Sequence, residues 1–473
     1  MVFSSFTFLF LFLPVVLCVY QFVPERHQNL VLLISSLIFY AWGGPCYLPL
    51  IAGEALVSWF CGVCIEGADS KEQKRLFLIV DLVVLLGLLA YFKYWGFLLG
   101  SIQALLHSNA DIVAPILPIG ISFYTFQLIS YVVDVYRGTV HAQRTYWKLL
   151  LYCSLFHQCI AGPIVRYETV ASEIDHRKAN LGDVYAGVRR FCVGLAKKAL
   201  LANACASLAD TLVPAGTGAL APQPLLGWWL GMIAYTLQIY LDFSGYSDMA
   251  IGLGRMIGFH YLENFDHPYL CTSVQDFWRR WHISLGSFFR DYVYIPLGGS
   301  RCDTLHYVRN MTVVWLLTGL WHGASWNYIL WGAYYLVFLL LEHFLIKGRL
   351  PKALAHVLTL IVVTLGWVLF RFENFGEMGM AFAGMFGIGA TGLSSLVVRT
   401  AFLQNIWLLI VSVVACTGAG SWLRHQLAVE ARTNDVALRL YNIEELLAPI
   451  VLLLLSTIAL AGASYSPFIY FQF

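Results

Sequence analysis

Uncharged, apolar stretches recur along the whole of this 473-residue chain, and several are long enough to cross a lipid bilayer. A transmembrane helix needs about 20 mostly apolar residues. Charged residues make up only 12% of the chain, whereas a soluble domain carries about 25%. The apolar runs are continuous rather than alternating, which favours helices over the strands of a membrane barrel. We therefore expect an all-α, polytopic integral membrane protein.

The positions of lysine and arginine predict which loops face the cytoplasm, because both residues are enriched on that side. The resulting topology has about a dozen crossings, with re-entrant and interfacial helices besides, and places both termini outside. The expected spans lie near residues 6–23, 29–43, 48–65, 76–100, 113–135, 187–210, 225–250, 311–322, 326–346, 353–371, 401–423 and 446–463.

The segment 149–165 is apolar but has basic residues on both flanks. We expect it to enter the membrane and return on the same side, which is tolerated where protein buries the backbone. The sequence shows no internal repeat and no linker, so a single transmembrane domain over residues 1–473 is predicted.

Charge and cysteine usage narrow the function. The net charge of +2 gives no reason to expect a nucleic-acid partner. Cys61 and Cys64 form a single CGVC stretch, which could indicate redox chemistry or metal binding. Without a second pair we expect both cysteines to pack within a helix. No Cys and His spacing predicts a zinc site, so no metal is expected.

A histidine, His322, lies within the apolar stretch GLWHGASWNYILWG at residues 319–332. A helix starting at Arg309 rises about 20 Å to reach it, at ~1.5 Å per residue. That places His322 past the middle of a hydrocarbon core ~30 Å thick. Ionisable groups at this depth are expensive and usually functional, although a histidine bonded to a neighbouring carbonyl is the structural alternative. Burial favours the neutral imidazole, which suits a general base acting on a hydroxyl.

A second histidine, His282, lies in DFWRRWHISLGSFFRDY at residues 276–292. Aromatic residues can line one side of a helix there, with charges among them, which is typical of a helix lying in the cytoplasmic interface. His282 would then lie near the inner face and His322 deeper or nearer the outer face. A purely structural role for His282 stays open. Two histidines at different depths would suit a tunnel with a mouth on each side.

A polar cluster, LDFSGYSDM at residues 241–249, ends one of the expected spans. Asp242 and Asp248 are six residues apart, so they do not share a face of a regular helix. We expect hydrogen bonding to the tunnel wall or to loops rather than metal binding. The sequence also shows neither a phosphate-binding P-loop nor a G-x-S-x-G nucleophile motif.

Several stretches resemble the membrane-bound O-acyltransferase (MBOAT) family. LWHG at 320–323 and DFWRRWHISL at 276–285 resemble the family as a whole. Other stretches are similar to its bacterial alginate O-acetyltransferase branch, and together they cover essentially the whole chain: MVFSS at the N-terminus, DFSGYSDMAIG at 242–252, RDYVYIPLGGSR at 290–301 and PFIYFQF at 467–473.

The resemblance implies a fold of many helices around a central tunnel, with the acyl donor entering from the cytoplasm. It implies that His322 is the essential catalytic histidine and that His282 is the second one, acting in chemistry, tunnel architecture or donor handling. We expect Arg279 and Arg280 to attract the anionic donor at the inner mouth. Trp278 and Trp321, beside the histidines, are the further candidate substrate-binding residues.

The resemblance also implies a pathway. An acetyl group from acetyl-CoA, with no bound cofactor, would cross the bacterial inner membrane. A periplasmic partner similar to SGNH hydrolases would then esterify an exported polysaccharide such as alginate or cellulose. Both termini would lie on the periplasmic side.

Other functions fit parts of the sequence. A sister branch transfers D-alanine to teichoic acids, which the terminal PFIYFQF disfavours. A transporter of a polymer precursor would have opposed half-repeats with broken helices, and the sequence does not show them. A scaffold that only recruits a periplasmic acetylase would leave His322 dispensable.

Overall fold

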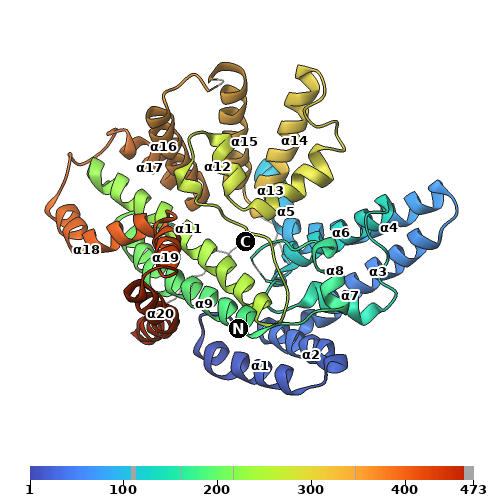
Figure 1. The fold of residues 1–473 in the computed structure, drawn as a ribbon. Helices are drawn as coiled ribbons and strands as arrows, with labels where there is room; N and C mark the ends of the chain where they lie inside the picture. Colours follow the sequence, from blue (N-terminus) through green and yellow to red (C-terminus); the bar gives the residue numbers. More distant parts are fainter. Residues whose placement is uncertain (108–112, 161, 217, 347, 463–473) are drawn as a thin grey trace. The chain divides into compact units, whose positions relative to one another are not determined.

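The fold is helical throughout its described parts. The computed structural model describes residues 1–107, 113–160, 162–216, 218–346 and 348–462, and every regular element within them is a helix (Figure 1). The predicted all-α class is therefore confirmed. The C-terminal motif PFIYFQF at 467–473 and the side on which the C-terminus lies fall outside the described residues.

Within the described ranges, seven helical segments are long and apolar enough to cross a membrane. The polytopic character is therefore confirmed. The remaining expected spans are also helical, except that 113–135 is helical only from Ile121. The total of about a dozen crossings stays a prediction. The seven segments are Pro45–Gly67, Lys71–Leu106, Leu181–Leu212, Trp326–Ile346, Lys352–Arg371, Leu396–Ala415 and Asp435–Gly462.

The chain forms two compact units, each drawn from two stretches of sequence. The first comprises Met1–Val188 and Met249–Glu263, and the second comprises Arg189–Asp248 and Asn264–Phe473. Two of the three divisions fall inside helices α9 (Leu181–Ala196) and α11 (Leu225–Met256), and the third, between Glu263 and Asn264, falls in the loop after α11. The single domain over residues 1–473 stays a prediction.

In the first unit, α3 packs against α4 and α6. This packing buries two carboxylates with hydroxyl partners, since Ser58 Oγ lies 2.8 Å from Asp81 Oδ1 and Thr125 Oγ1 lies 2.9 Å from Glu54 Oε2. The helices of this unit are η1 (Phe8–Phe12), α1 (Leu13–Phe22), α2 (Glu25–Gly43), η2 (Pro45–Tyr47), α3 (Leu48–Gly67), α4 (Lys71–Leu89), η3 (Ala90–Tyr94), α5 (Trp95–Leu106), α6 (Ile121–Arg137), α7 (Tyr146–Ser154), α8 (Tyr167–Asp175), the start of α9 and the end of α11.

The segment expected to be re-entrant, 149–165, is part helix and part loop. It continues from α7 into a buried, non-helical stretch at 155–160. The Tyr152 hydroxyl donates a 2.8 Å hydrogen bond to the carbonyl of Val165. Protein therefore buries this irregular backbone, as a re-entrant segment requires, and re-entry itself stays a prediction.

The second unit holds both predicted catalytic histidines. Its helices, besides the parts of α9 and α11 that belong to it, are η4 (Lys197–Ala202), α10 (Asn203–Leu212), η5 (Pro268–Leu270), α12 (Val274–Arg280), α13 (Ile283–Phe289), η6 (Arg290–Tyr294), α14 (Thr304–His322), α15 (Trp326–Leu341), η7 (Glu342–Ile346), α16 (Lys352–Arg371), α17 (Phe375–Met385), α18 (Leu396–Ala415), α19 (Ala419–Glu430) and α20 (Asp435–Gly462).

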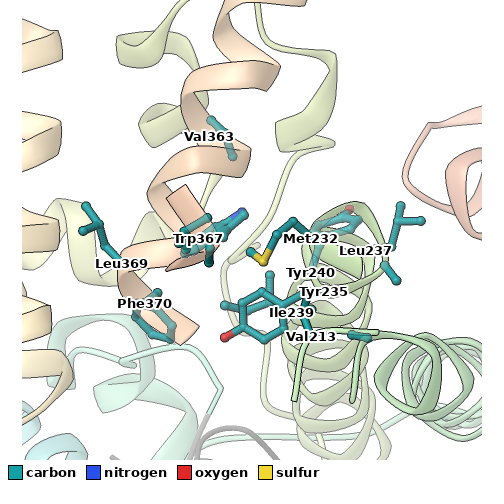
Figure 2. Close-up of a cluster of buried hydrophobic side chains, with 14 of the residues drawn as sticks. Val213, Met232, Tyr235, Leu237, Ile239, Tyr240, Val363, Trp367, Leu369 and Phe370 are labelled. Atoms are coloured by element: carbon teal, nitrogen blue, oxygen red, sulfur yellow. The ribbon is translucent and has the colours of Figure 1, made fainter. Parts of the chain in front are cut away.

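The core of the second unit is built from large side chains of α11 and α16. Figure 2 shows Trp367 and Phe370 of α16 on the side that faces Met232 and Tyr235 of α11. Trp367 is 1% exposed and Met232 is fully buried. In a lipid surrounding, tight packing rather than the hydrophobic effect holds helices together, so this interlocked core fixes α16 against α11.

Candidate active site

His322 is the last residue of α14, and it is 3% exposed. Its ring lies against three aromatic side chains from three helices. The ring centroids are 5.0 Å from Trp321, 4.9 Å from Trp331 of α15 and 5.4 Å from Phe370 of α16. An imidazole in such surroundings is largely removed from water, as the sequence predicted.

Glycines allow the close packing of α14 and α15 that positions His322. A Cβ atom on Gly319 would lie 2.3 Å from the carbonyl oxygen of Tyr328, and one on Gly332 would lie 2.3 Å from that of Trp315. A Cβ atom on Gly323 would meet the ring of Tyr328 at 2.2 Å. The glycines of the stretch that surrounds His322 therefore let two backbones approach closely, as small residues do in membrane helices.

The expected single interfacial helix over residues 276–292 is wrong. The chain breaks at Trp281 and His282, between α12 and α13, and His282 has a left-handed backbone (φ 47°, ψ 55°). This turn directs His282 inward, where it is 1% exposed. The break arises because Asn264 bonds the first amides of α13 across the turn: its carbonyl accepts from Ile283 N (2.9 Å) and its side-chain oxygen from Ser284 N (3.1 Å).

The His282 ring is enclosed by aromatic groups and is tied to one amide. Its centroid is 4.7 Å from Phe243 and 5.7 Å from Trp321, and its Nδ1 lies 3.1 Å from Oδ1 of Asn264. Burial lowers the pKa of His282 to about 3. The ring is therefore neutral at physiological pH. The place of Asn264 beside His282 depends on a loop that sequence patterns do not predict.

A pocket of about 430 Å³ opens beside α12, α13 and α14. This volume falls within the range of small-ligand sites. His282, Trp278 and Arg279 line the pocket, and so do Trp315, Thr318 and Arg290.

Arg280, the neighbour of Arg279, is not among the residues that line the pocket. Its guanidinium instead bonds Asp276 (2.7 Å) and lies 3.6 Å from Asp266. Of the two arginines predicted to attract a donor, the structure therefore brings only Arg279 to the pocket beside His282.

Aromatic side chains connect the pocket to His322. Trp321 contacts both histidine rings. On another route, Trp278 of the pocket lies 5.4 Å from Trp331, which in turn contacts His322. The two histidine rings are therefore separated by about the width of one indole. That His282 lies near the inner face and His322 deeper or nearer the outer face stays a prediction.

The polar cluster of α11 is held by cations from η4 and α9. Asp242 lies 2.7 Å from Nζ of Lys198, and both side chains are almost fully buried. Asp248 is bound by Lys197 (2.7 Å) and Arg190 (3.0 Å). The two aspartates use different partners, as expected from their spacing. The predicted bonding of this cluster takes the form of ion pairs that sequence reasoning did not identify.

Metal-binding groups of three or more His, Cys, Asp and Glu side chains are absent from the part of the chain that the structure describes. Cys61 is buried, Cys64 is partly buried, and neither forms a disulfide. Packing inside α3 accounts for both.

Comparison with known proteins agrees with this arrangement. Residues 145–356, which include the pocket and both histidines, match the MBOAT, membrane-bound O-acyltransferase family. The chain is 40% identical over 504 residues to the probable alginate O-acetylase AlgI of Azotobacter vinelandii, with all of both chains covered. The chain belongs to the membrane-bound O-acyltransferase family. It is therefore a membrane-embedded acyltransferase. This assignment takes the place of the transporter and scaffold hypotheses.

Other relatives have different names. The chain is 33% identical to the peptidoglycan O-acetyltransferase of Helicobacter pylori, over 84% of this chain and 82% of the relative. It is 28% identical to the teichoic acid D-alanyltransferase of Bacillus subtilis, over 54% of this chain and 68% of the relative. The full-length similarity is thus to O-acetylating proteins, and similarity to the D-alanyl branch is partial.

Proposed function

We propose that this protein transfers an acetyl group from cytoplasmic acetyl-CoA across the bacterial inner membrane for O-acetylation of an exported polysaccharide. The observation that carries the proposal is the full-length, 40% identity to the probable alginate O-acetylase. The buried pair of histidines beside a pocket with an exposed arginine supports it. Alginate is the first candidate polymer, and cellulose or another wall or capsule polymer is the alternative.

His322 acts as the general base in this proposal. One of its ring nitrogens takes the proton of the acceptor hydroxyl as the hydroxyl oxygen attacks the thioester carbonyl. The new C–O bond forms, the C–S bond breaks, and the proton leaves with the thiol of coenzyme A. The aromatic surroundings of His322 keep water away, which limits hydrolysis of the thioester.

The pocket beside His282 receives the donor. Coenzyme A carries phosphate groups, and the guanidinium of Arg279 can bind a phosphate through paired hydrogen bonds. Trp278 and Trp315 provide flat apolar surfaces for the pantetheine arm. The two routes of aromatic contact then run from the pocket toward His322, with Trp321 on one of them.

Transfer to the polymer itself requires an acceptor outside the membrane. We propose that a periplasmic protein similar to SGNH hydrolases takes the acetyl group and esterifies the sugar hydroxyls. Both termini of this chain would lie on the same, periplasmic side. The chain contains no G-x-S-x-G motif of its own, which supports such a division of labour.

Deletion and complementation test the proposal. Cells that lack the protein should export polysaccharide without ester-linked acetate, and the native protein should restore the acetate. Chemical assay of acetate released by mild base measures it. Export that stops on deletion would contradict the proposal in favour of transport, and D-alanine in place of acetate would favour the sister activity.

A further inference from the structure

We propose that Asn264 is a positioning residue that fixes the tautomer of His282 and so presents its Nε2 lone pair to the pocket. This inference rests on the proposed function. The proton that His322 takes from the acceptor hydroxyl passes to Nε2 of His282 and from there to the sulfur of coenzyme A as the C–S bond breaks, so His322 remains the base that activates the hydroxyl.

The orientation of the Asn264 side chain is fixed by its partners. Its Oδ1 lies 3.1 Å from the backbone nitrogen of Ser284, and a backbone N–H can only donate. The atom at that position must therefore be the oxygen of the amide. On the other side, Nδ2 of Asn264 donates to the hydroxyl of Ser247 at 3.3 Å. Exchange of the amide oxygen and nitrogen would place two donors face to face.

The tautomer of His282 follows from this orientation. Oδ1 of Asn264 accepts only, and Nδ1 of His282 lies 3.1 Å from it. The Ser284 hydroxyl also lies 3.4 Å from Nδ1, but it donates its proton to Oδ1 of Asn264 at 2.8 Å. Nδ1 must therefore carry the proton, and in a neutral imidazole the other nitrogen, Nε2, then holds the lone pair. Asn264 is fully buried and His282 is 1% exposed, so water does not compete for this bond.

The backbone of His282 supports a functional reading of the same geometry. A non-glycine residue with positive φ is uncommon and strained, and His282 has φ 47°. Asparagine, aspartate and histidine are the non-glycine residues that adopt this conformation most readily. Backbone strain at a buried residue is typical of functional sites.

Charged groups around His282 are few and mostly paired. Burial is the cause that lowers the pKa of His282. The titratable groups on the elements that pack against it include His322 of α14, Asp276, Arg279 and Arg280 of α12, Asp266 in the loop beside α12, and Asp242, Asp248 and the buried tyrosines of α11. Both α11 carboxylates have cationic partners, and Asp266 lies beside Arg280. A new charge at position 264 would therefore act directly on His282.

Asn264→Asp tests the inference through the pH profile. The carboxylate keeps an acceptor for Ser284 N and for Nδ1, and the Ser247 hydroxyl can turn to donate to it. Its negative charge favours the protonated imidazole. The reaction needs the unprotonated Nε2. On the acidic side of the pH–activity profile (the acid limb), the pH at which activity falls should therefore rise by at least about one pH unit. A purely structural Asn264 would leave the limb unmoved.

His282→Asn provides the second test. Its side-chain NH₂ can replace Nδ1–H as the donor to Asn264, and asparagine suits the left-handed backbone, so the protein should accumulate normally. It has no group equivalent to the Nε2 base, and activity should fall by about 100-fold or more.

Activity is measured as ester acetate formed on polysaccharide by membrane vesicles from producing cells supplied with acetyl-CoA. Asn310→Asp is the matched control, because Asn310 is equally buried but bonds Arg309 and Gly299. The acid limb of this variant should match that of the native protein.

Two results would overturn the inference. One is an Asn264→Asp protein whose acid limb does not move, and the other is a His282→Asn protein with activity near the native value. If Asn264→Asp does not accumulate, His282→Asn decides alone. Inactive native vesicles would instead contradict the proposed function.

Discussion

Arg279 and Arg280 are adjacent in sequence, yet the structure gives them different surroundings. Residue type and spacing led to the same prediction for both. The side chains diverge because Arg280 lies one helical turn from Asp276 and bonds it, whereas Arg279 lines the pocket. Which of two neighbouring arginines reaches a site depends on the direction of a short helix, and the sequence does not specify that direction.

Arg279→Gln should therefore weaken donor use, and Arg280→Gln should not. Loss of a charged hydrogen bond to phosphate should raise the KM for acetyl-CoA about tenfold, equivalent to ~1.4 kcal/mol. Arg280→Gln loses a partly exposed helical ion pair of ~0.3–0.5 kcal/mol, and its KM should stay within about twofold of the native value. Initial rates in vesicles at varied acetyl-CoA concentrations measure both. Equal effects of the two variants would contradict the placement of the donor.

His322 ends α14, and a short turn joins it to α15, which packs closely against α14. The sequence predicted both helices and the turn after His322, because apolar length and the glycines indicate them. It did not predict the break between α12 and α13. The bonds from Asn264 that stabilise this break come from a loop that precedes α12 in the sequence, and the amphipathic pattern runs through the break without interruption.

Gly332→Ala should disrupt the packing of α14 and α15. The added Cβ would lie 2.3 Å from a backbone oxygen, and forced overpacking typically costs about 1–3 kcal/mol. The thermal unfolding temperature of the purified protein should fall. Gly379→Ala on α17 is the matched control, because a Cβ there meets nothing within 4 Å and alanine favours a helix by about 1 kcal/mol. A Gly332→Ala protein as stable as native would show that the helices do not approach as described.

At the scale of the whole molecule, composition and continuous apolar runs were enough to predict an all-α membrane protein, and motifs along the chain were enough to predict its family. The approach of His282 to His322 was not predictable. The membrane depth expected for His322 came from the length of helix between Arg309 and His322. The depth expected for His282 came from the assumption that residues 276–292 form one interfacial helix. The inward turn at His282 brings its ring to Trp321, which also contacts His322.

The buried pair of Lys198 and Asp242 should matter for the stability of the whole protein. Lys198→Met removes the cation beside the buried carboxylate of Asp242, and removing one partner of a buried pair typically costs about 3–5 kcal/mol. Its abundance in membranes and its unfolding temperature should fall sharply. Lys198→Met combined with Asp242→Asn removes both charges and should recover most of the loss. A double variant no better than the single one would contradict a mainly electrostatic role.

The central claim is that His322 is the base for acyl transfer, and ester-linked acetate on exported polysaccharide tests it most directly. Cells should carry His322→Ala, the native protein, or the control His425→Ala, whose side chain is exposed on α19, at equal membrane abundance. Loss of a general base lowers rates by about 10²–10⁴-fold, so His322→Ala should leave about 1% or less of the native acetate while export continues. Acetate at the native level with His322→Ala would contradict the account.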